Sequence, residues 1–415
     1  MSDRYDVTFD RALALTLERL HPLAPVSRPV WKACDLVLAE DAVAAVDSPS
    51  LNASTKDGYA VRSDDVAGAT PDQPVSLALA GVTVAGGAAG PCVEPGTAVH
   101  VMTGAALPDG ADAVLAVEFT RSEDESVLAL SGAGPGRNIL RRGSDVTVGQ
   151  TVVAAGSPLA PAMTGLLAAS GLERVPVHPR PCVGVVATGD EVVAPGRPLR
   201  PGQLYASNLV TLQAWLNRFG MNCRSTLVAD DPDRMRVVLE EVLADSDVVL
   251  TSGGAWKSER DFTAQVLETM GFEIVYHRVK LGPGKAVALA VRDDRAVFCL
   301  PGGPPSNEMA FLQLALPGLL RLAGRSPEPF QRTTARLTGE VARRWSVDLT
   351  WTQFFQARLS TDDDGLVAEP LRWRSRLRCQ ASADAVVELP AGTEQLGPDD
   401  PARVQILHQT GLHVP

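Results

Sequence analysis

The strongest constraint on the fold is an alternation of strand-like and helix-like hydrophobic patterns between residues 183 and 324. At its centre, Val248-Val249-Leu250-Thr251 leads directly into Ser252-Gly253-Gly254, and an amphipathic segment follows at residues 262–270. A short apolar run that ends in a glycine turn before a helix is typical of a parallel strand in an open α/β sheet. The alternation therefore predicts a doubly wound parallel sheet within residues 179–326.

The glycine turn at Gly253 and Gly254 has two interpretations. Glycine lets backbone N–H groups approach an anion, and such turns before a helix bind phosphorylated ligands. Asp261, at the start of the next helix, could hold a metal ion or cap that helix. Alternatively, the turn is only a tight connection, because many α/β turns contain two glycines.

Length and charge limit the possible classes of protein. With 415 residues the chain is too long for one hydrophobic core, so we expect about two to four domains. The net charge is −11 and no run of basic residues is present, which argues against nucleic-acid and anionic-membrane partners. An anionic ligand must therefore meet local positive groups.

Cysteine usage and hydropathy indicate a cytoplasmic protein. The six cysteines have no paired spacing, and Cys182 and Cys299 lie in apolar runs, as expected of free thiols in a reducing compartment. The acidic N-terminus has no signal-peptide pattern. The longest uncharged stretch, residues 149–171, contains Pro158 and Pro161, which do not suit a membrane-spanning helix.

Three further regions surround the α/β pattern. Residues 8–20 and 159–171 have helical patterns, and we expect these two helices to pack on each other. The region between them has short apolar runs separated by Gly, Pro and Asp-Gly, which is typical of a small β domain. The expected domains are a discontinuous helical domain (1–46 and 141–178), an inserted β-rich domain (47–140), the α/β domain (179–326) and a C-terminal β domain (327–415).

Acidic residues recur after the predicted strands of the α/β domain. They are Asp190, Glu191, Asp230, Asp231 and Asp261. Mg²⁺ prefers one or two carboxylates together with water and the phosphates of a ligand, which fits such a group. Each residue taken alone is also explained by the preference of Asp and Glu for helix starts. Their concentration on successive strand ends favours a shared site.

Lys285 ends the sequence Gly-Pro-Gly-Lys, which resembles part of a triphosphate-binding loop. Position 279 is Val279, so the complete glycine spacing fails and nucleoside-triphosphate hydrolysis is disfavoured. A lysine that reaches an anion from a glycine loop is still consistent with the sequence. The six histidines show no ligand spacing, and no zinc site or catalytic triad can be assembled from neighbouring residues.

Seven short motifs follow one another along the chain. They are Asp57-Gly58-Tyr59-Ala60-Val61, Met102-Thr103-Gly104-Ala105, Thr188-Gly189-Asp190-Glu191, Tyr205-Ala206-Ser207-Asn208, Thr251-Ser252-Gly253-Gly254, Pro283-Gly284-Lys285 and Leu300-Pro301-Gly302. In this order and spacing the chain resembles the MoeA-type molybdopterin molybdenumtransferases (the gephyrin E domain family). Each motif alone is unspecific, but the resemblance covers nearly the whole length.

The resemblance implies an elongated, multidomain subunit of the α/β plus β class, with a MogA-like α/β domain. It also implies a homodimer whose active site lies between the α/β domain of one subunit and the β domain of its partner. There, with Mg²⁺, adenylylated molybdopterin and molybdate (or tungstate) would give the molybdenum cofactor and AMP. An upstream molybdopterin adenylyltransferase is the expected protein partner.

The resemblance and the strand-end argument together assign the site residues. The expected catalytic residues are Asp57, Glu191, Asp261 and Lys285. The expected substrate-binding residues are Thr103, Thr188, Gly189, Ser252, Gly253, Gly254, Lys257, Pro301 and Ser306. The expected Mg²⁺ ligands are Glu191, Asp230 and Asp261. Positive charge from a metal and a lysine suits the cleavage of a phosphoanhydride beside an oxyanion.

The chain departs from the family pattern near the expected anion site. The departing residues are Lys56, Trp256, Lys257, Ser258, Gly282, Ala286, Gly303, Gln356 and Arg374. Gly282 replaces a second loop lysine, and we hypothesise that Lys56, Lys257 and Arg374 relocate its charge. Alternatively, these three are solvated surface charges. Trp256 either stacks on the pterin or adenine or packs against the sheet.

These departures leave two further functions open. The chain could be a catalytically altered homologue that acts as a molybdopterin-binding or scaffold protein, although a pure scaffold would not need the retained carboxylates. A nucleotide-dependent adenylylating enzyme is disfavoured by the incomplete triphosphate loop.

Overall fold

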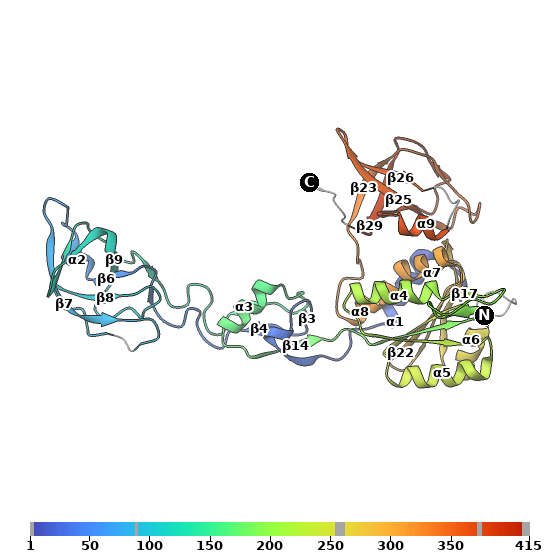
Figure 1. The fold of residues 1–415 in the computed structure, drawn as a ribbon, viewed down its shortest axis with the longest axis horizontal. Helices are drawn as coiled ribbons and strands as arrows, with labels where there is room; N and C mark the ends of the chain where they lie inside the picture. Colours follow the sequence, from blue (N-terminus) through green and yellow to red (C-terminus); the bar gives the residue numbers. More distant parts are fainter. Residues whose placement is uncertain (1–3, 88–89, 254–261, 372–375, 409–415) are drawn as a thin grey trace. The chain divides into compact units, whose positions relative to one another are not determined.

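The computed structural model describes residues 4–87, 90–253, 262–371 and 376–408. The chain forms two compact units, one made of Met1–Pro25 with His178–Pro415 and the other of Val26–Val177. Figure 1 shows the secondary structure of both. Within the described residues, no helix is both long enough and apolar enough to cross a membrane.

The centre of the first unit is a run of four parallel strands. Their order from edge to centre is β18 (Cys223–Val228), β15 (Val183–Thr188), β19 (Val248–Ser252) and β22 (Arg295–Leu300). The chain starts at β15, continues on one side with β18 and then crosses to the other side with β19. The boundary between β15 and β19 is therefore a switch point, where ligands bind in open α/β sheets.

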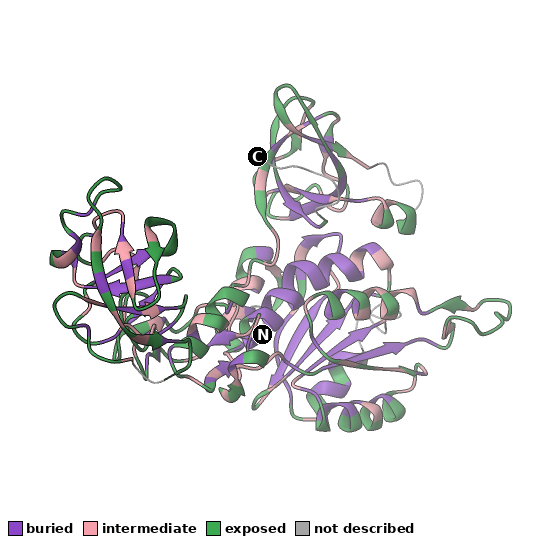
Figure 2. Cartoon of the chain, turned by 60° about the vertical axis from the view of Figure 1, so that its left-hand side comes forward, coloured by how far each residue is buried: buried purple, intermediate pink, exposed green. Residues whose placement is uncertain are grey.

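Helices cover both faces of these strands. One face packs against α4 (Ser207–Arg218), α7 (Pro304–Ala310), the π-helical turn η3 (Phe311–Ala315) and α8 (Leu316–Leu322). The other packs against α5 (Pro232–Ala244) and α6 (Phe262–Thr269). Every residue of β15 and β19 is buried, and Figure 2 draws the strands of this sheet in the colour of buried residues. The doubly wound arrangement predicted from the sequence is therefore present.

The sheet is mixed, whereas the sequence predicted a parallel one. Beyond β22 the strand β21 (Ala288–Arg292) runs antiparallel to both of its neighbours, β22 and β20 (Glu273–Gly282). The connections at 283–287 and 293–294 are too short for a crossover between parallel strands, so antiparallel hairpins form instead.

Helix α1 (Phe9–Arg19) belongs to the α/β unit, not to the discontinuous helical domain that we predicted for it. The preceding strand β1 (Tyr5–Thr8) pairs in parallel with β20 and so fixes the helix on this sheet. Phe9, Ala12 and Thr16 are buried there, and the Thr16 hydroxyl lies 3.0 Å from that of Tyr276. The predicted packing of this helix on residues 159–171 is therefore wrong.

The ends of two helices show how well local signals predict boundaries. Helix α4 begins at Ser207 after the N-cap Ala206, and Gly220 follows its C-terminal end at φ 67°, in the left-handed region that favours glycine. Asp231 caps α5 by accepting a hydrogen bond from the Arg234 backbone N–H at 2.9 Å. Asp231 therefore has a structural role.

The C-terminal part of the first unit is a β domain with its own core. Its strands are β23 (Arg332–Leu337), β24 (Val341–Ala342), β25 (Thr352–Asp362), β26 (Gly365–Pro370), β27 (Ala385–Leu389), β28 (Gln395–Leu396) and β29 (Pro401–Ile406). Strand β25 pairs with the end of β20, and α9 (Arg376–Ala381) contacts α7. These contacts join the β domain to the α/β domain.

The second unit contains a six-stranded sheet, and all six strands lie within residues 47–140. In order they are β10 (Thr120–Ser122), β11 (Ser126–Ala129), β7 (Val75–Thr83), β8 (Thr97–Val101), β6 (Gly58–Val61) and β9 (Ala113–Ala116). The short helix α2 (Ser63–Val66) and the 3-10 turn η2 (Val117–Phe119) accompany this sheet.

The rest of the second unit combines short strands with one longer helix. The paired strands are β2 (Val26–Pro29), β14 (Arg174–His178) and β3 (Val37–Leu38), β4 (Ala42–Val43) with β13 (Thr151–Val153), and β5 (Ala53–Ser54) with β12 (Ile139–Leu140). Helix α3 (Pro161–Ala169) packs on β13 and on the 3-10 turn η1 (Val30–Lys32).

Gly184 tests the close packing of strand and helix in the α/β domain. A Cβ atom at this position in β15 would lie 2.1 Å from Val242 Cγ1 on α5. We expect Gly184→Ala to lower the free energy of unfolding by about 1–3 kcal/mol, measured by urea titration. Gly339→Ala is the control, because its nearest neighbour would be Pro370 Cδ at 3.8 Å. An unchanged stability of Gly184→Ala would contradict this packing.

Candidate functional site

Polar residues after β15 and β18 meet at the carboxyl edge of the parallel strands. The buried Thr188 hydroxyl donates to Asp230 Oδ1 at 2.7 Å, and the Asp230 N–H donates to Asp190 Oδ1 at 3.2 Å. These two bonds fix the Asp230 carboxylate and its backbone beside the end of β15. The convergence expected from the sequence is thus present for these residues.

Two asparagines hold the turn that follows β19. The buried Ser252 Oγ accepts hydrogen bonds from Asn208 Nδ2 at 3.1 Å and from Asn307 Nδ2 at 3.0 Å. Asn208 also donates to the Gly302 carbonyl at 2.8 Å, and Asn307 donates to the Pro301 carbonyl at 2.9 Å. The ends of β19 and β22 are therefore joined through side chains of α4 and α7.

Neither asparagine was predicted from the sequence to be a site residue. Asn208 occurred only within a family motif, and Asn307 occurred in none. Both lie in the first turn of a helix that starts at this edge of the sheet, where a polar side chain is usually attributed to helix capping. Their position in the first turn of helices that follow strands was the available signal.

Glycine is required on both sides of the switch point. Gly253 has φ 104°, and a Cβ atom there would lie 2.5 Å from the Thr188 carbonyl oxygen. Gly189 has φ 144°, and its Cβ would lie 2.8 Å from Glu191 Oε2. Any other residue at these two positions would strain the backbone and bring its Cβ too close to these neighbours, so both turns require glycine. Gly254 lies outside the described residues.

Lys285 and Ser306 lie near the same edge. Ala288, at the start of β21, pairs with Cys299 near the end of β22, so the turn that carries Lys285 adjoins the carboxyl ends of the parallel strands. Lys285 is half-buried, and its carbonyl accepts a hydrogen bond from the Val279 N–H at 2.9 Å. Ser306 is half-buried in the first turn of α7.

The described carboxylates fit an open magnesium site but not a closed protein cage. Glu191 and Asp230 are exposed at the strand ends. Within the described residues, no three His, Cys, Asp or Glu side chains are grouped as a metal site, and Asp261 lies outside that part of the chain. Mg²⁺ needs only one or two carboxylates when phosphates and water complete its shell, so Asp230 and Glu191 suit it.

Asp57 and Thr103 form a separate polar pair in the second unit. Gly58 pairs with Val101, which brings the residue before β6 beside the end of β8. Asp57 Oδ1 accepts the Thr103 backbone N–H at 2.7 Å and the Thr103 hydroxyl at 3.1 Å. These two bonds, the backbone one first, lower the pKa of Asp57 below its ordinary value, so the exposed carboxylate is ionised at neutral pH.

The structure explains one departure from the family pattern. A side chain at Gly282 would meet Trp345, whose Cβ lies 2.9 Å from the position of an added Cβ. The expected lysine therefore does not fit beside this tryptophan. Gln356 is buried in β25, and its Oε1 has no partner among the described residues.

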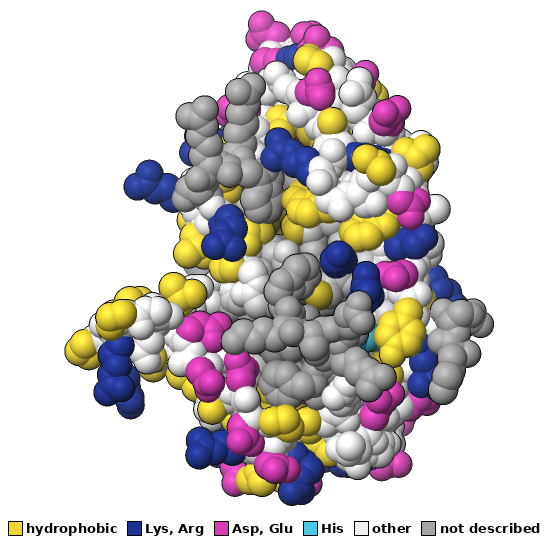
Figure 3. Space-filling view, turned by 90° about the vertical axis from the view of Figure 1, so that its right-hand side faces the viewer, with side chains coloured by type: hydrophobic (Ala, Val, Ile, Leu, Met, Phe, Trp, Pro, Cys, Tyr) yellow, Lys and Arg dark blue, Asp and Glu magenta, His cyan; other side chains and the backbone are white. Residues whose placement is uncertain are grey.

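One of the three residues proposed to relocate positive charge lies within the described part of the chain. Lys56 is exposed beside Asp57, while Trp256, Lys257 and Arg374 lie outside the described residues. On the face drawn in Figure 3, acidic and basic side chains are interspersed over the visible coloured surface. Any anion site on that face therefore depends on a few local groups.

The switch point, the glycine turns and the strand-end carboxylates define an α/β ligand-binding domain joined to β domains. Residues 7–171 match the sequence family described as MoeA N-terminal region (domain I and II). Residues 184–321 match the family described as Probable molybdopterin binding domain. The chain therefore belongs to the MoeA family of molybdopterin molybdenumtransferases.

Individual relatives agree with this assignment. The chain is 34% identical over 384 residues to molybdopterin molybdenumtransferase 2 of Mycobacterium tuberculosis, covering 90% of this chain and 93% of the relative. It is 34% identical over 325 residues to the molybdopterin molybdenumtransferase of Haemophilus influenzae, covering 77% and 78% of the two chains. The crystal structure of the molybdopterin biosynthesis MoeA protein from Pyrococcus horikosii has a TM-score of 0.83 and 32% identity, covering 98% of this chain and 100% of that one.

The Asp57–Thr103 contact predicts a measurable change in pKa. Thr103→Val removes the hydroxyl donor and keeps the stronger backbone N–H donor, so we expect the pKa of Asp57 to rise only part of the way to its ordinary value. Titration of the carboxyl carbon by NMR measures it. Thr70→Val, an exposed threonine of the same unit, should leave this pKa unchanged. An unchanged pKa in Thr103→Val would show that the hydroxyl does not act on Asp57.

Proposed function

We propose that this protein inserts molybdenum from molybdate into adenylylated molybdopterin and releases AMP. The observation that carries the proposal is the Ser252–Gly253 turn, held by Asn208 and Asn307 at the switch point of the sheet. Curated relatives that share about a third of the sequence carry the name of this activity. A turn of this kind suits a phosphorylated ligand, because its backbone N–H groups can face an anion.

The proposed substrate contacts follow from the geometry of the edge. Gly189 and Gly253 keep the two turns free of side chains, and among the described residues Gly303 has open space where a Cβ would stand, with no neighbouring atom within 4 Å. The phosphates would occupy this region, with Lys285 supplying positive charge and Ser306 a hydroxyl. The Thr188 hydroxyl holds the Asp230 carboxylate, and the Pro301 carbonyl is held by the Asn307 side chain.

We propose that Mg²⁺ is held by Asp230, Glu191 and Asp261, with the ligand's phosphates. When bound, the ion supplies positive charge that offsets the negative charge developing on the phosphoanhydride oxygens. The Thr188 hydroxyl holds the Asp230 carboxylate in one orientation. This hydrogen bond reduces the reorganisation that metal binding would require.

We further propose that the ionised Asp57 and Thr103 complete the site from the partner subunit of a homodimer. The pair is exposed, as a group that meets a substrate must be. None of the six cysteines, all of which lie within the described residues, forms a disulfide, which suits the reducing cytoplasm where we propose that the protein acts. An upstream molybdopterin adenylyltransferase would supply its substrate.

AMP release tests the proposed function. Purified protein incubated with adenylylated molybdopterin, Mg²⁺ and molybdate should release AMP, and removal of Mg²⁺ with a chelator should stop the reaction reversibly. Asp230→Asn keeps the Thr188 hydrogen bond but loses a charge, so we expect its rate to fall about 100-fold. Asp233→Asn, in the first turn of α5, is the control and should keep the wild-type rate.

The same experiment separates the alternatives. Tungstate in place of molybdate shows which oxyanion is used. Pterin binding without AMP release by the wild-type protein would favour a scaffold role, and full activity of Asp230→Asn would exclude Asp230 as a metal ligand.

Self-association is a second test. We expect sedimentation over a concentration series to show a dimer, and activity per subunit to fall on dilution into the monomer range. An active monomer at every concentration would contradict a site shared between subunits.

A further inference from the structure

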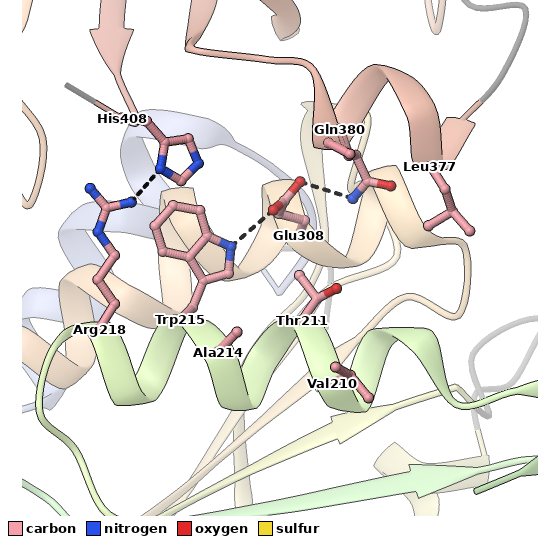
Figure 4. A pocket seen from close by; sticks show the side chains of 10 residues that line it. Val210, Thr211, Ala214, Trp215, Arg218, Glu308, Leu377, Gln380 and His408 are labelled. Carbon is pink, nitrogen blue, oxygen red and sulfur yellow. Dashed lines mark hydrogen bonds between the residues drawn. The ribbon is translucent and has the colours of Figure 1, made fainter. Parts of the chain in front are cut away.

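A pocket lies in the first unit, and none of its lining residues belongs to the strand-end site. It has a volume of about 540 Å³ and opens between α4, α7 and α9 (Figure 4). Helix α4 supplies one stripe of its surface, namely Val210, Ala214 and Arg218, spaced four residues apart. Leu377 on α9 lies across from this stripe and is exposed. The walls therefore come from both the α/β domain and the C-terminal β domain.

One corner of the pocket contains a buried carboxylate. Glu308 on α7 is 9% exposed. Its Oε1 accepts a hydrogen bond from the Trp215 indole N–H at 2.9 Å, and its Oε2 accepts one from Gln380 Nε2 at 2.8 Å. Both donors are neutral. A buried carboxylate is stabilised further by a positive partner, and its oxygens can accept more than one hydrogen bond each.

The Gln380 amide is held in one orientation in the same corner. The Gln380 Nε2 group donates to Glu308 and to the Pro304 carbonyl at 3.2 Å, and these two acceptors fix the orientation of the amide. Its Oε1 atom is buried, and among the described residues it has no hydrogen-bond partner. Because that oxygen is closed off from solvent, the acceptor that this corner offers to another molecule is the Glu308 carboxylate.

The other end of the pocket is positive. Arg218 Nη1 donates to His408 Nδ1 at 2.7 Å, and the guanidinium lies 5.2 Å from the centre of the Trp215 ring. Burial, followed by the nearby Arg218 charge, lowers the pKa of His408, so the imidazole is neutral at pH 7. This end repels a second cation, and the acceptors at Glu308 and Gln380 repel anions such as phosphate.

We propose that this pocket binds a small organic monocation, an amine, amidine or guanidine on an apolar ring or chain. The cationic N–H groups contact Glu308, and the apolar body lies against Ala214, Val210 and Leu377. Because α4 and α9 belong to different domains, the bound molecule also holds the C-terminal β domain against the α/β domain. The inference is independent of the proposed transferase function.

Benzamidine and its neutral isostere benzamide test the proposal by calorimetric titration of the full-length chain. We expect wild-type protein to bind benzamidine roughly tenfold or more tightly than benzamide. Both molecules can donate N–H hydrogen bonds to Glu308, but only the N–H donors of benzamidine carry a positive charge. Glu308→Gln should remove this preference. Equal binding of the two probes by the wild-type protein, or no binding of benzamidine, would overturn the proposal.

A pocket-filling variant covers the case in which Glu308→Gln does not fold. Ala214 is exposed on α4, so Ala214→Phe fills the pocket without disturbing the core and should abolish benzamidine binding. Asn217→Phe adds the same ring to an exposed position of the same helix outside the pocket and should bind as wild type does. Undiminished binding by Ala214→Phe would show that the probe binds elsewhere and would overturn the proposal.

Discussion

The parallel pairing of β15 with both β18 and β19 is the constraint on which the site depends. Because the chain leaves β15 toward one side and returns on the other, the connections that follow β15 and β19 diverge at the carboxyl ends of the strands, where open α/β sheets bind ligands. Polar side chains then fix the ends of these strands. Thr188 ties the β18 loop to β15, while Asn208 and Asn307 tie the β19 turn to the end of β22. Elements far apart in sequence thus present one edge to a ligand.

The antiparallel hairpins beyond β22 bring Lys285 and the C-terminal domain to the carboxyl edge of the parallel strands. Strands β21 and β20 are antiparallel, so the turn between them returns to the carboxyl edge and brings Lys285 there. Pairing of β20 with β25 also attaches the C-terminal domain at this edge. At this same junction Gly282 lies against Trp345 of the C-terminal domain. That contact leaves no room for a second lysine at position 282.

Sequence patterns predicted which segments form helices and strands better than they predicted which elements pair or pack together. The apolar run before Gly253 predicted both the buried strand and the turn, because periodicity and glycine are local signals. The pattern of α1 showed that one face is buried but not what buries it, and the β1–β20 pairing that decides this joins residues more than 250 positions apart. Asp231 resembled a metal ligand and is a helix cap, whereas Asn307, whose one local signal was its place in the first turn of a helix, holds the Ser252 turn. Side-chain networks of this kind depend on the tertiary structure, which a single sequence does not display.

A crystal structure of the protein with adenylylated molybdopterin and Mg²⁺ tests the central claim most directly. The account predicts phosphate oxygens within hydrogen-bonding distance of the Ser252–Gly253 turn, the Lys285 ammonium group beside them and the metal ion on Asp230. Phosphates bound away from the switch point, with this turn unoccupied, would contradict it.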